Sequence, residues 1–284
     1  MRWTDDRSDN VDDRRGSGGG GGMLVGGGLG TIIIAAIVFF LGGDPSAILS
    51  SGMQTQSSAP ARELSQNEKQ AEQFISMLTA ENEETWSGIF ANYNMQFRPA
   101  KVVMFEQATR SGCGTAQSAM GPFYCPVDET IYMDLSFFNE LQSRFGAKVG
   151  QFSVAYVLAH EYGHHIQNVL GVLSETDNLR RSGRYSETQL NQVSVATELQ
   201  ADFYAGLWAR STENREKFLD PGDIEEAIGA AQAVGDDNIQ QRSQGYIDQD
   251  HWTHGSAAQR TQWFMKGYQT GDIKQGDTFK QLLK

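Results

Sequence analysis

Two histidines one helical turn apart, with a glutamate between them, are the most chemically specific feature of the chain. His160 and His164 are four residues apart, and Glu161 directly follows the first of them. Residues four apart lie on one face of an α-helix, about 5 to 6 Å between Cβ atoms, so both imidazoles can reach one metal ion. Glu161 flanks this face, where a carboxylate can take a proton from a water on the metal. The spacing is HExxH, which is typical of zinc peptidases.

A third ligand is expected, because a catalytic zinc site usually has three protein ligands and an open position. The extended pattern HExxHxxGxxH would need a glycine at Gln167 and a histidine at Leu170, and the chain has neither. The best candidate is Glu198, with Asp202 four residues later on the same helical face. We expect Glu198 to complete a His/His/Glu set, and Asp202 to accept the second N–H of a ligating imidazole.

Two predicted helices position these residues. Residues 152–170 carry HExxH, have apolar side chains at intervals of three and four, and contain no proline. Residues 189–210 form the second predicted helix and carry Glu198 and Asp202. Ala201 lies between these two carboxylates and is small enough to let the helices approach closely. A pair of carboxylates four residues apart is common on helices, but downstream of HExxH it indicates a ligand.

The rest of the folded region is predicted to be a mostly helical α+β domain with a small β-sheet. Ser65 is a plausible N-cap at the start of this domain. The other predicted elements are helices at 65–80, 84–93, 137–144, 221–234 and 257–268, a strand at 101–106, and a hairpin within 121–135 whose second arm is 130–134.

The combination of HExxH and ExxxD resembles the glutamate-type zinc metallopeptidases, and the whole chain resembles the bacterial putative neutral zinc metallopeptidase family. The resemblance covers both ends of the chain. Besides the two metal motifs, it runs through residues 1–3, 8–11, 13–15, 113–114, 121–126 and 253–255. It implies a membrane-tethered zinc peptidase with a zincin-like, gluzincin-type domain. It also implies that an edge strand upstream of the zinc helix pairs with the peptide substrate, although an ordinary sheet edge that caps the core is equally compatible with the sequence.

The expected chemistry is hydrolysis of a peptide bond by a zinc-activated water. One Zn²⁺ held by His160, His164 and Glu198 would lower the pKa of bound water to about 7. Glu161 would act as general base and pass the proton to the leaving amine.

The sequence leaves more than one candidate for the hydrogen-bond donor that stabilises the oxyanion. Related peptidases bring in such a side chain after the metal motifs, and His254 lies at that position. Tyr246 and Tyr204 remain alternative donors. His165 points about 100° away from His164 on the helix and is expected to be structural or exposed. His251 is expected to be only a neighbour of the site.

The composition of the chain indicates which partners it can bind and where in the cell it lies. The net charge of −12 and the pI near 4.8 argue against nucleic acid as a partner. Residues 23–43 form the only long uncharged apolar run, and at about 1.5 Å per residue they would span roughly 31 Å. They are predicted to be a transmembrane helix that contacts the lipid bilayer. A cleaved signal peptide or a buried core helix is the alternative.

These features predict the domain organisation. The basic pair Arg14 and Arg15 precedes the apolar run, so the N-terminus is expected in the cytoplasm and the peptidase domain outside, periplasmic or extracellular. The protein would then be a single-pass protein of the bacterial inner membrane. The predicted segments are a cytoplasmic Gly-rich tail at 1–22, a transmembrane helix at 23–43, a flexible linker at 44–64 and the zinc metallopeptidase domain at 65–284.

The chain has two cysteines, Cys113 and Cys125. In an oxidising compartment they could close a short loop by a disulfide. Two buried free thiols are the alternative.

We therefore predict a membrane-anchored zinc-dependent peptidase with a peptide or protein substrate. Two other functions remain open: a non-enzymatic, membrane-tethered zinc-binding protein, and a zinc hydrolase of non-peptide amides.

Overall fold

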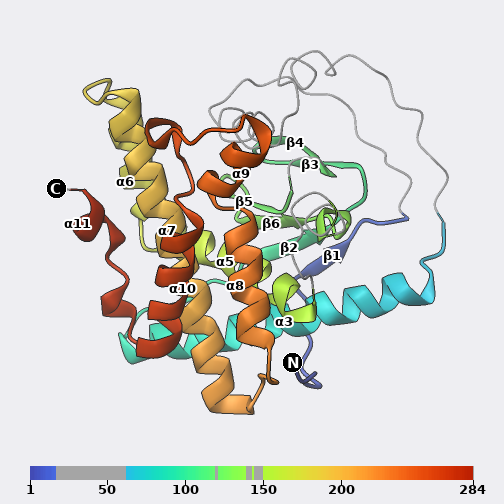
Figure 1. Cartoon of the computed structure of the whole chain (residues 1–284). Coiled ribbons are helices and arrows are strands. Elements are labelled where there is room, and N and C mark those ends of the chain that lie inside the picture. Colours follow the sequence, from blue (N-terminus) through green and yellow to red (C-terminus); the bar gives the residue numbers. More distant parts are fainter. Residues whose placement is uncertain (17–61, 119–120, 139–142, 144–149, 284) are drawn as a thin grey trace.

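The computed structural model describes residues 1–16, 62–118, 121–138, 143 and 150–283 (Figure 1). Helices dominate this part of the chain, and the strands form two small sheets, so the predicted mostly helical α+β class is confirmed. The helices are α3 (Gln66–Asn92), α5 (Gln151–Val169), α6 (Val172–Arg181), α7 (Glu187–Glu216), α8 (Asp223–Ala233), α9 (Asp236–Ser243), α10 (Ala257–Thr270), α11 (Thr278–Leu282) and the short 3₁₀ helices η3 (Gln249–His251) and η4 (Ile273–Gln275).

The larger sheet has four strands in the order β1-β2-β6-β5. Strands β1 (Val11–Asp13), β2 (Lys101–Met104) and β6 (Thr130–Met133) are parallel, whereas β5 (Phe123–Cys125) is antiparallel to β6 and lies at the edge. The hairpin and the strand that were predicted around β5, β6 and β2 are therefore confirmed. A second sheet pairs β3 (Ala108–Ser111) with β4 (Gly114–Gln117).

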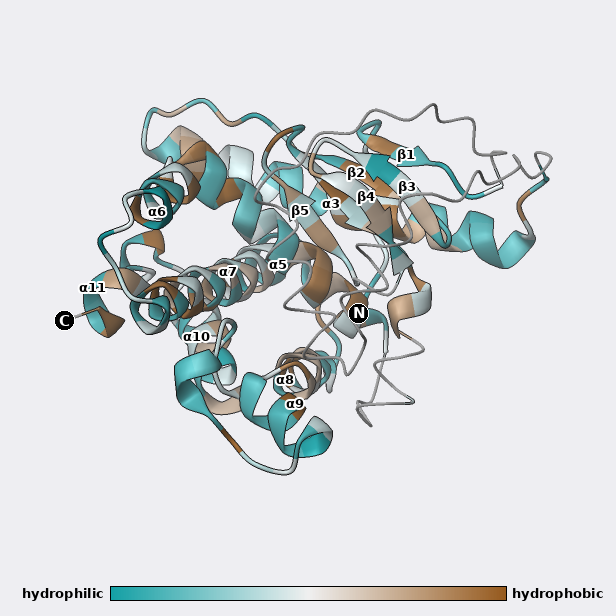
Figure 2. Ribbon diagram, turned by 90° about the horizontal axis from the view of Figure 1, so that it is seen from above, coloured by the Kyte–Doolittle hydropathy of each residue, from teal (hydrophilic) through white to brown (hydrophobic). Residues whose placement is uncertain are grey.

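The two faces of the larger sheet lie in different cores. Alternate residues of a strand point to opposite faces, so Val102 and Ile131 pack into the main core with α5, while Val103 and Tyr132 form a small second core beneath the β3–β4 hairpin. Figure 2 shows α5 and α7 side by side in the middle of the helical part, with α6, α8 and α10 around them. The predicted metal motifs therefore lie on the two central helices.

Helix α3 is one continuous helix of 27 residues, not the two predicted short ones. Ser65 caps it through a capping box with Glu68. The predicted break at residues 81–83 is wrong because Glu81 and Glu83 form contacts with other parts of the chain, Glu83 as the acceptor of hydrogen bonds from Ser8 and Asn10. Glu81 is fully buried and pairs with Arg215 of α7, and Asn82 donates to the carbonyl of Leu78 one turn earlier.

Residues 1–16 are part of the folded unit. The Trp3 ring stacks on Phe74 of α3 with centroids 5.2 Å apart, and its Nε1–H donates to Gln151 at the start of α5. Strand β1 adds to the sheet beside β2, with Val11 opposite Val102. The N-terminal segment thus contacts α3, α5 and the sheet that supports the metal motifs.

This arrangement overturns the predicted membrane topology. The predicted span at 23–43 lies outside the described residues, but the residues on either side of that region meet: Arg62 N–H donates to Gly16 O at 2.8 Å. Because β1 and β2 share a sheet, residues 1–16 and the domain lie on the same side of any membrane, whereas a single crossing would separate them. Within the described ranges we find no helix with the length and apolarity needed to cross a bilayer. The prediction of a single-pass inner-membrane protein with a cytoplasmic N-terminus and an outer domain is therefore wrong.

Candidate metal centre

Helices α5 and α7 come into direct contact at Gly163 and Ala201. A Cβ placed on Gly163 would lie 2.9 Å from both the Cα and the carbonyl oxygen of Ala201, closer than real Cβ atoms approach. Glycine inside HExxH and alanine inside ExxxD therefore permit the close helix approach expected from Ala201. This contact sets the separation of the two metal motifs.

The contact brings three predicted ligands together. Nε2 of His160 lies 3.2 Å from Oε2 of Glu198, and Nε2 of His164 lies 3.5 Å from Oε1 of Glu198. Donor atoms of a tetrahedral zinc site with bonds near 2.1 Å are about 3.4 Å apart, so these side chains fit the ion. In the described part of the chain this donor group has three members, with the donor atoms within 4.8 Å of one another.

Asp202 contacts the ring nitrogen of His160 that faces away from the other two ligands. Its Oδ1 lies 2.8 Å from His160 Nδ1, which leaves Nε2 to face the other two ligands. Tyr156 donates to the same oxygen at 2.5 Å, and Arg260 of α10 donates to both carboxylate oxygens at 2.8 and 3.0 Å. Burial opposes ionisation of Asp202, but Arg260 and His160 outweigh it and hold its pKa at about 2. Asp202 is thus an ionised acceptor that can fix the tautomer and orientation of a metal ligand.

Arg260 was not identified from the sequence. Its partner lies on another helix, and the spacing of residues within α10 does not show that contact. The available signal was a single arginine within the helical stretch that follows the Ser256 cap. Arg260 is 3% exposed, so its charge balances Asp202 inside the protein.

Gln167 orients the second histidine. His164 Nδ1 lies 2.8 Å from Gln167 Oε1, and the Gln167 amide donates to the carbonyl of Thr197 on α7 at 2.7 Å. Gln167 stands where the extended histidine pattern would have glycine. In the sequence, Gln167 only excludes the extended pattern, and its contact with His164 one turn earlier is not apparent.

Glu161 is buried beside the ligands but lies outside the ligand group. Burial is the main cause that raises the pKa of its carboxyl group, against the lowering effect of the nearby histidines and of a hydrogen bond from the backbone N–H of Tyr124. Tyr124 belongs to β5, so the edge strand contacts the carboxyl group that was predicted to act as general base. A carboxylate with a raised pKa is suited to accept and return a proton near neutral pH.

His254 lies in a loop that Asp236 fixes. The buried Asp236 Oδ2 accepts the backbone N–H groups of Thr253, His254 and Gly255 at 2.8, 2.7 and 2.9 Å. Its Oδ1 lies 3.3 Å from His254 Nδ1, which leaves Nε2 available for another partner. Burial lowers the pKa of His254, but Asp236 and the charge of Glu198 outweigh it and raise the pKa. The loop lies against α7, because a Cβ on Gly255 would be 3.3 Å from the side chain of Leu199, the residue that follows Glu198.

The other candidate residues lie elsewhere. Tyr204 is 3% exposed, and its ring packs edge-on against Trp86 in the core between α3 and α7. Tyr246 is 61% exposed, and no described residue hydrogen-bonds its hydroxyl group. His165 is fully buried and bridges Tyr124 to a backbone carbonyl, so its role is structural. His251 pairs with Asp248 on the surface.

A disulfide joins Cys113 to Cys125. Cys113 lies at the tip of the β3–β4 hairpin and Cys125 at the end of β5. The bond therefore ties the hairpin to the strand that contacts Glu161.

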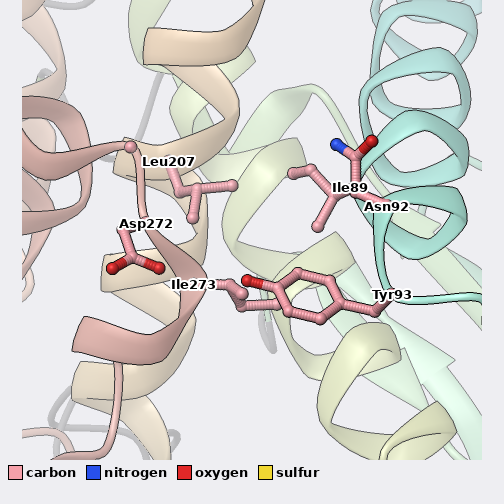
Figure 3. A pocket seen from close by; sticks show the side chains of 7 residues that line it. Ile89, Asn92, Tyr93, Leu207, Asp272 and Ile273 are labelled. Atoms are coloured by element: carbon pink, nitrogen blue, oxygen red, sulfur yellow. The ribbon is translucent and has the colours of Figure 1, made fainter.

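A separate cavity of about 320 Å³ lies between the C-terminal end of α3, α7 and the segment after α10 (Figure 3). Ile89, Tyr93 and Ile273 face one another across it. Leu207 lines it and is nine residues beyond Glu198 on α7, which is roughly 13 Å along the helix axis. This cavity is therefore distinct from the metal centre.

Comparison with known proteins relates the chain to several bacterial proteins and to one family. The uncharacterized protein YpfJ of Escherichia coli K12 is 41% identical over 292 residues, which cover all of both chains. The uncharacterized proteins Mb2605 of Mycobacterium bovis and Rv2575 of Mycobacterium tuberculosis are each 49% identical over 185 residues, covering 62% of this chain and 61% of theirs. No solved structure matches the chain. The family described as putative neutral zinc metallopeptidase matches residues 1–279, and the chain belongs to that family.

Proposed function

We propose that the chain is a zinc-dependent peptidase of the glutamate type. The observation that carries the proposal is a set of three mutually close ligands beside a fourth acidic group, Glu161, that does not belong to the set. A structural zinc site is closed by four protein ligands, whereas a catalytic one keeps a position open. The three-member donor set favours catalysis over the non-enzymatic alternative.

Each residue has a role that follows from its surroundings. Zinc, when bound, would polarise the scissile carbonyl and make a water molecule acidic enough to act near neutral pH. Glu161 would accept the proton of that water and deliver it to the leaving amine. His254, held at Nδ1 by Asp236, would donate from Nε2 to the oxyanion.

Strand β5 supports a peptide as the substrate. It is the edge strand of the sheet, and its residue Tyr124 contacts Glu161 through the backbone. An extended peptide added along this edge would therefore pass next to the general base.

The test compares the full chain with Glu161→Gln, using zinc quantification and a peptide-library cleavage assay read by mass spectrometry. We expect Glu161→Gln to retain zinc and lose cleavage, and His160→Ala to lose the metal itself. Equal cleavage by wild type and Glu161→Gln would refute the role of Glu161. A zinc-loaded wild type that cleaves non-peptide amides but no peptide would favour the non-peptide hydrolase instead.

A further inference from the structure

A half-buried arginine that forms no ion pair with any described residue lies close to the metal centre. Arg180 is in the last turn of α6, and its guanidinium donates to Ser194 Oγ on α7. The neighbouring Arg181 takes Asp177 as its ion-pair partner at 2.7 Å. Among the described residues, Arg180 itself has no ion pair. It is partly withdrawn from water, and the carboxylate that acts on it from a distance is that of Asp177, which raises the pKa of Arg180 but forms its ion pair with Arg181.

The position of Ser194 relates Arg180 to the metal ligands. Ser194 precedes Glu198 by four residues on α7, so it lies about 6 Å along the axis and about 40° around it. Seen along the axis of α7, Ser194 lies on the same side of Glu198 as Ala201, which contacts α5. Leu199, which contacts Gly255, lies on the opposite side of Glu198. Ser194 therefore continues the face of α7 that carries Glu198, and Arg180 lies over that face one turn beyond the metal centre.

The chemistry of Arg180 calls for an anionic partner. A guanidinium offers five N–H donors in a planar fork that matches a carboxylate. Ser194 Oγ occupies part of this fork, and its own hydroxyl donates to the carbonyl of Leu190. Partial burial of a charge is costly unless a partner compensates, and burial lowers the pKa of Arg180. A carboxylate supplied by a ligand would provide that compensation.

We propose that Arg180 is a specificity residue that binds a carboxylate of the substrate. This proposal rests on the peptidase function proposed above. An extended peptide advances about 3.3 to 3.6 Å per residue, so the carboxylate would lie roughly two or three residues from the peptide bond at the metal. It belongs either to the C-terminus of a short peptide or to an aspartate or glutamate side chain.

The test measures peptide binding without turnover. The full chain, loaded with zinc and carrying Glu161→Gln, is immobilised and exposed to a hexapeptide library with free C-terminal carboxylates and to the same library with amidated C-termini. Retained peptides are quantified by mass spectrometry. Stronger retention of the peptides with free C-termini would show that Arg180 binds the terminal carboxylate. Enrichment of Asp or Glu among the retained amidated peptides would show that it binds an acidic side chain.

We expect Arg180→Gln to reduce retention of the preferred peptides about 10- to 100-fold, as for the loss of a charge-assisted hydrogen-bonded pair. Arg180→Lys, which keeps the charge and loses the fork, should lie in between. The matched control is Arg184→Gln, which removes an exposed arginine just beyond α6 without releasing Asp177 from its ion pair with Arg181, and should leave retention unchanged.

Three results would overturn the proposal: no retention of either library, equal retention by Arg180→Gln, or an equal loss in Arg184→Gln. The peptidase function is tested separately by cleavage with Glu161 intact. Carboxylate-dependent binding without any cleavage would refute the peptidase and leave the Arg180 subsite standing. Cleavage without carboxylate preference would refute the subsite alone.

Discussion

Replacing Gly163 by alanine should separate metal affinity from protein stability. The added Cβ would lie 2.9 Å from backbone atoms of Ala201, where ordinary contact begins at 3.4 Å, so α5 and α7 must separate by about 0.5 Å at this point. Zinc sites tolerate deviations of about 0.2 Å in ligand distance. We therefore expect zinc affinity to fall by at least about 10- to 100-fold, the cost typical of losing an outer-shell contact.

The effect on stability should be much smaller, because two terms oppose each other. Alanine is favoured over glycine in a helix by about 0.8 to 1 kcal/mol, and overpacking a tight contact costs about 1 to 3 kcal/mol. The metal-free variant should therefore lose no more than about 2 kcal/mol of unfolding free energy. Thermal unfolding of the metal-free protein and zinc competition against a chelator measure the two quantities separately.

The controls are Gly88→Ala on α3 and Gly229→Ala on α8, where an added Cβ meets nothing within 4 Å. Both should stabilise the protein slightly and leave zinc affinity unchanged. Ala201→Gly should not rescue Gly163→Ala, because the Cα and carbonyl oxygen of residue 201 remain in place. Zinc affinity of Gly163→Ala within twofold of wild type would refute the argument that this contact sets the ligand geometry.

Three further predictions follow from the same structure. His254→Ala should lower kcat by about 10²- to 10³-fold with unchanged zinc content, and an unchanged kcat would remove His254 as the oxyanion donor. Arg260→Gln should weaken zinc binding about 10- to 100-fold in chelator competition, because Asp202 loses its cationic partner; equal affinity would contradict this role. Deleting residues 1–16 should lower Tm by more than about 4 °C, because Trp3 stacks on α3 and β1 pairs with β2; an unchanged Tm in a thermal scan would contradict the packing of the N-terminal segment.

The sequence was sufficient where a property depends on local spacing. His160, His164, Glu198 and Asp202 were identified because residues four apart share a helical face, and the structure brings these side chains together. The β5–β6 hairpin was predicted from the alternation and turn residues in 121–135. Each metal motif is defined by spacing within one helix, and the hairpin is formed by neighbouring strands, whereas the contact that joins the two motifs lies between Gly163 and Ala201.

The sequence was insufficient where the determining contact is distant along the chain. Glu81 interrupts the apolar pattern of α3, yet the helix continues because Arg215 neutralises this buried carboxylate. Asp236 and Arg260 act on His254 and Asp202 from other elements, so no local spacing marks them. The apolar composition of residues 23–43 predicted a membrane crossing. The pairing of β1 with β2, which local composition does not show, keeps residues 1–16 on the same side of any membrane as the rest of the domain.

Helix α10 couples the two sides of the metal centre. Arg260 lies within it and holds Asp202 behind the ligand His160, while the loop carrying His254 ends directly at its cap. Its backbone packs against α7 without intervening side chains, because a Cβ on Gly267 would overlap the carbonyl of Phe203. A shift of α10 along α7 would therefore displace the oxyanion donor and the charge that fixes the metal ligand together. Helix α10 is thus as much a part of the candidate site as the two helices that carry the metal motifs.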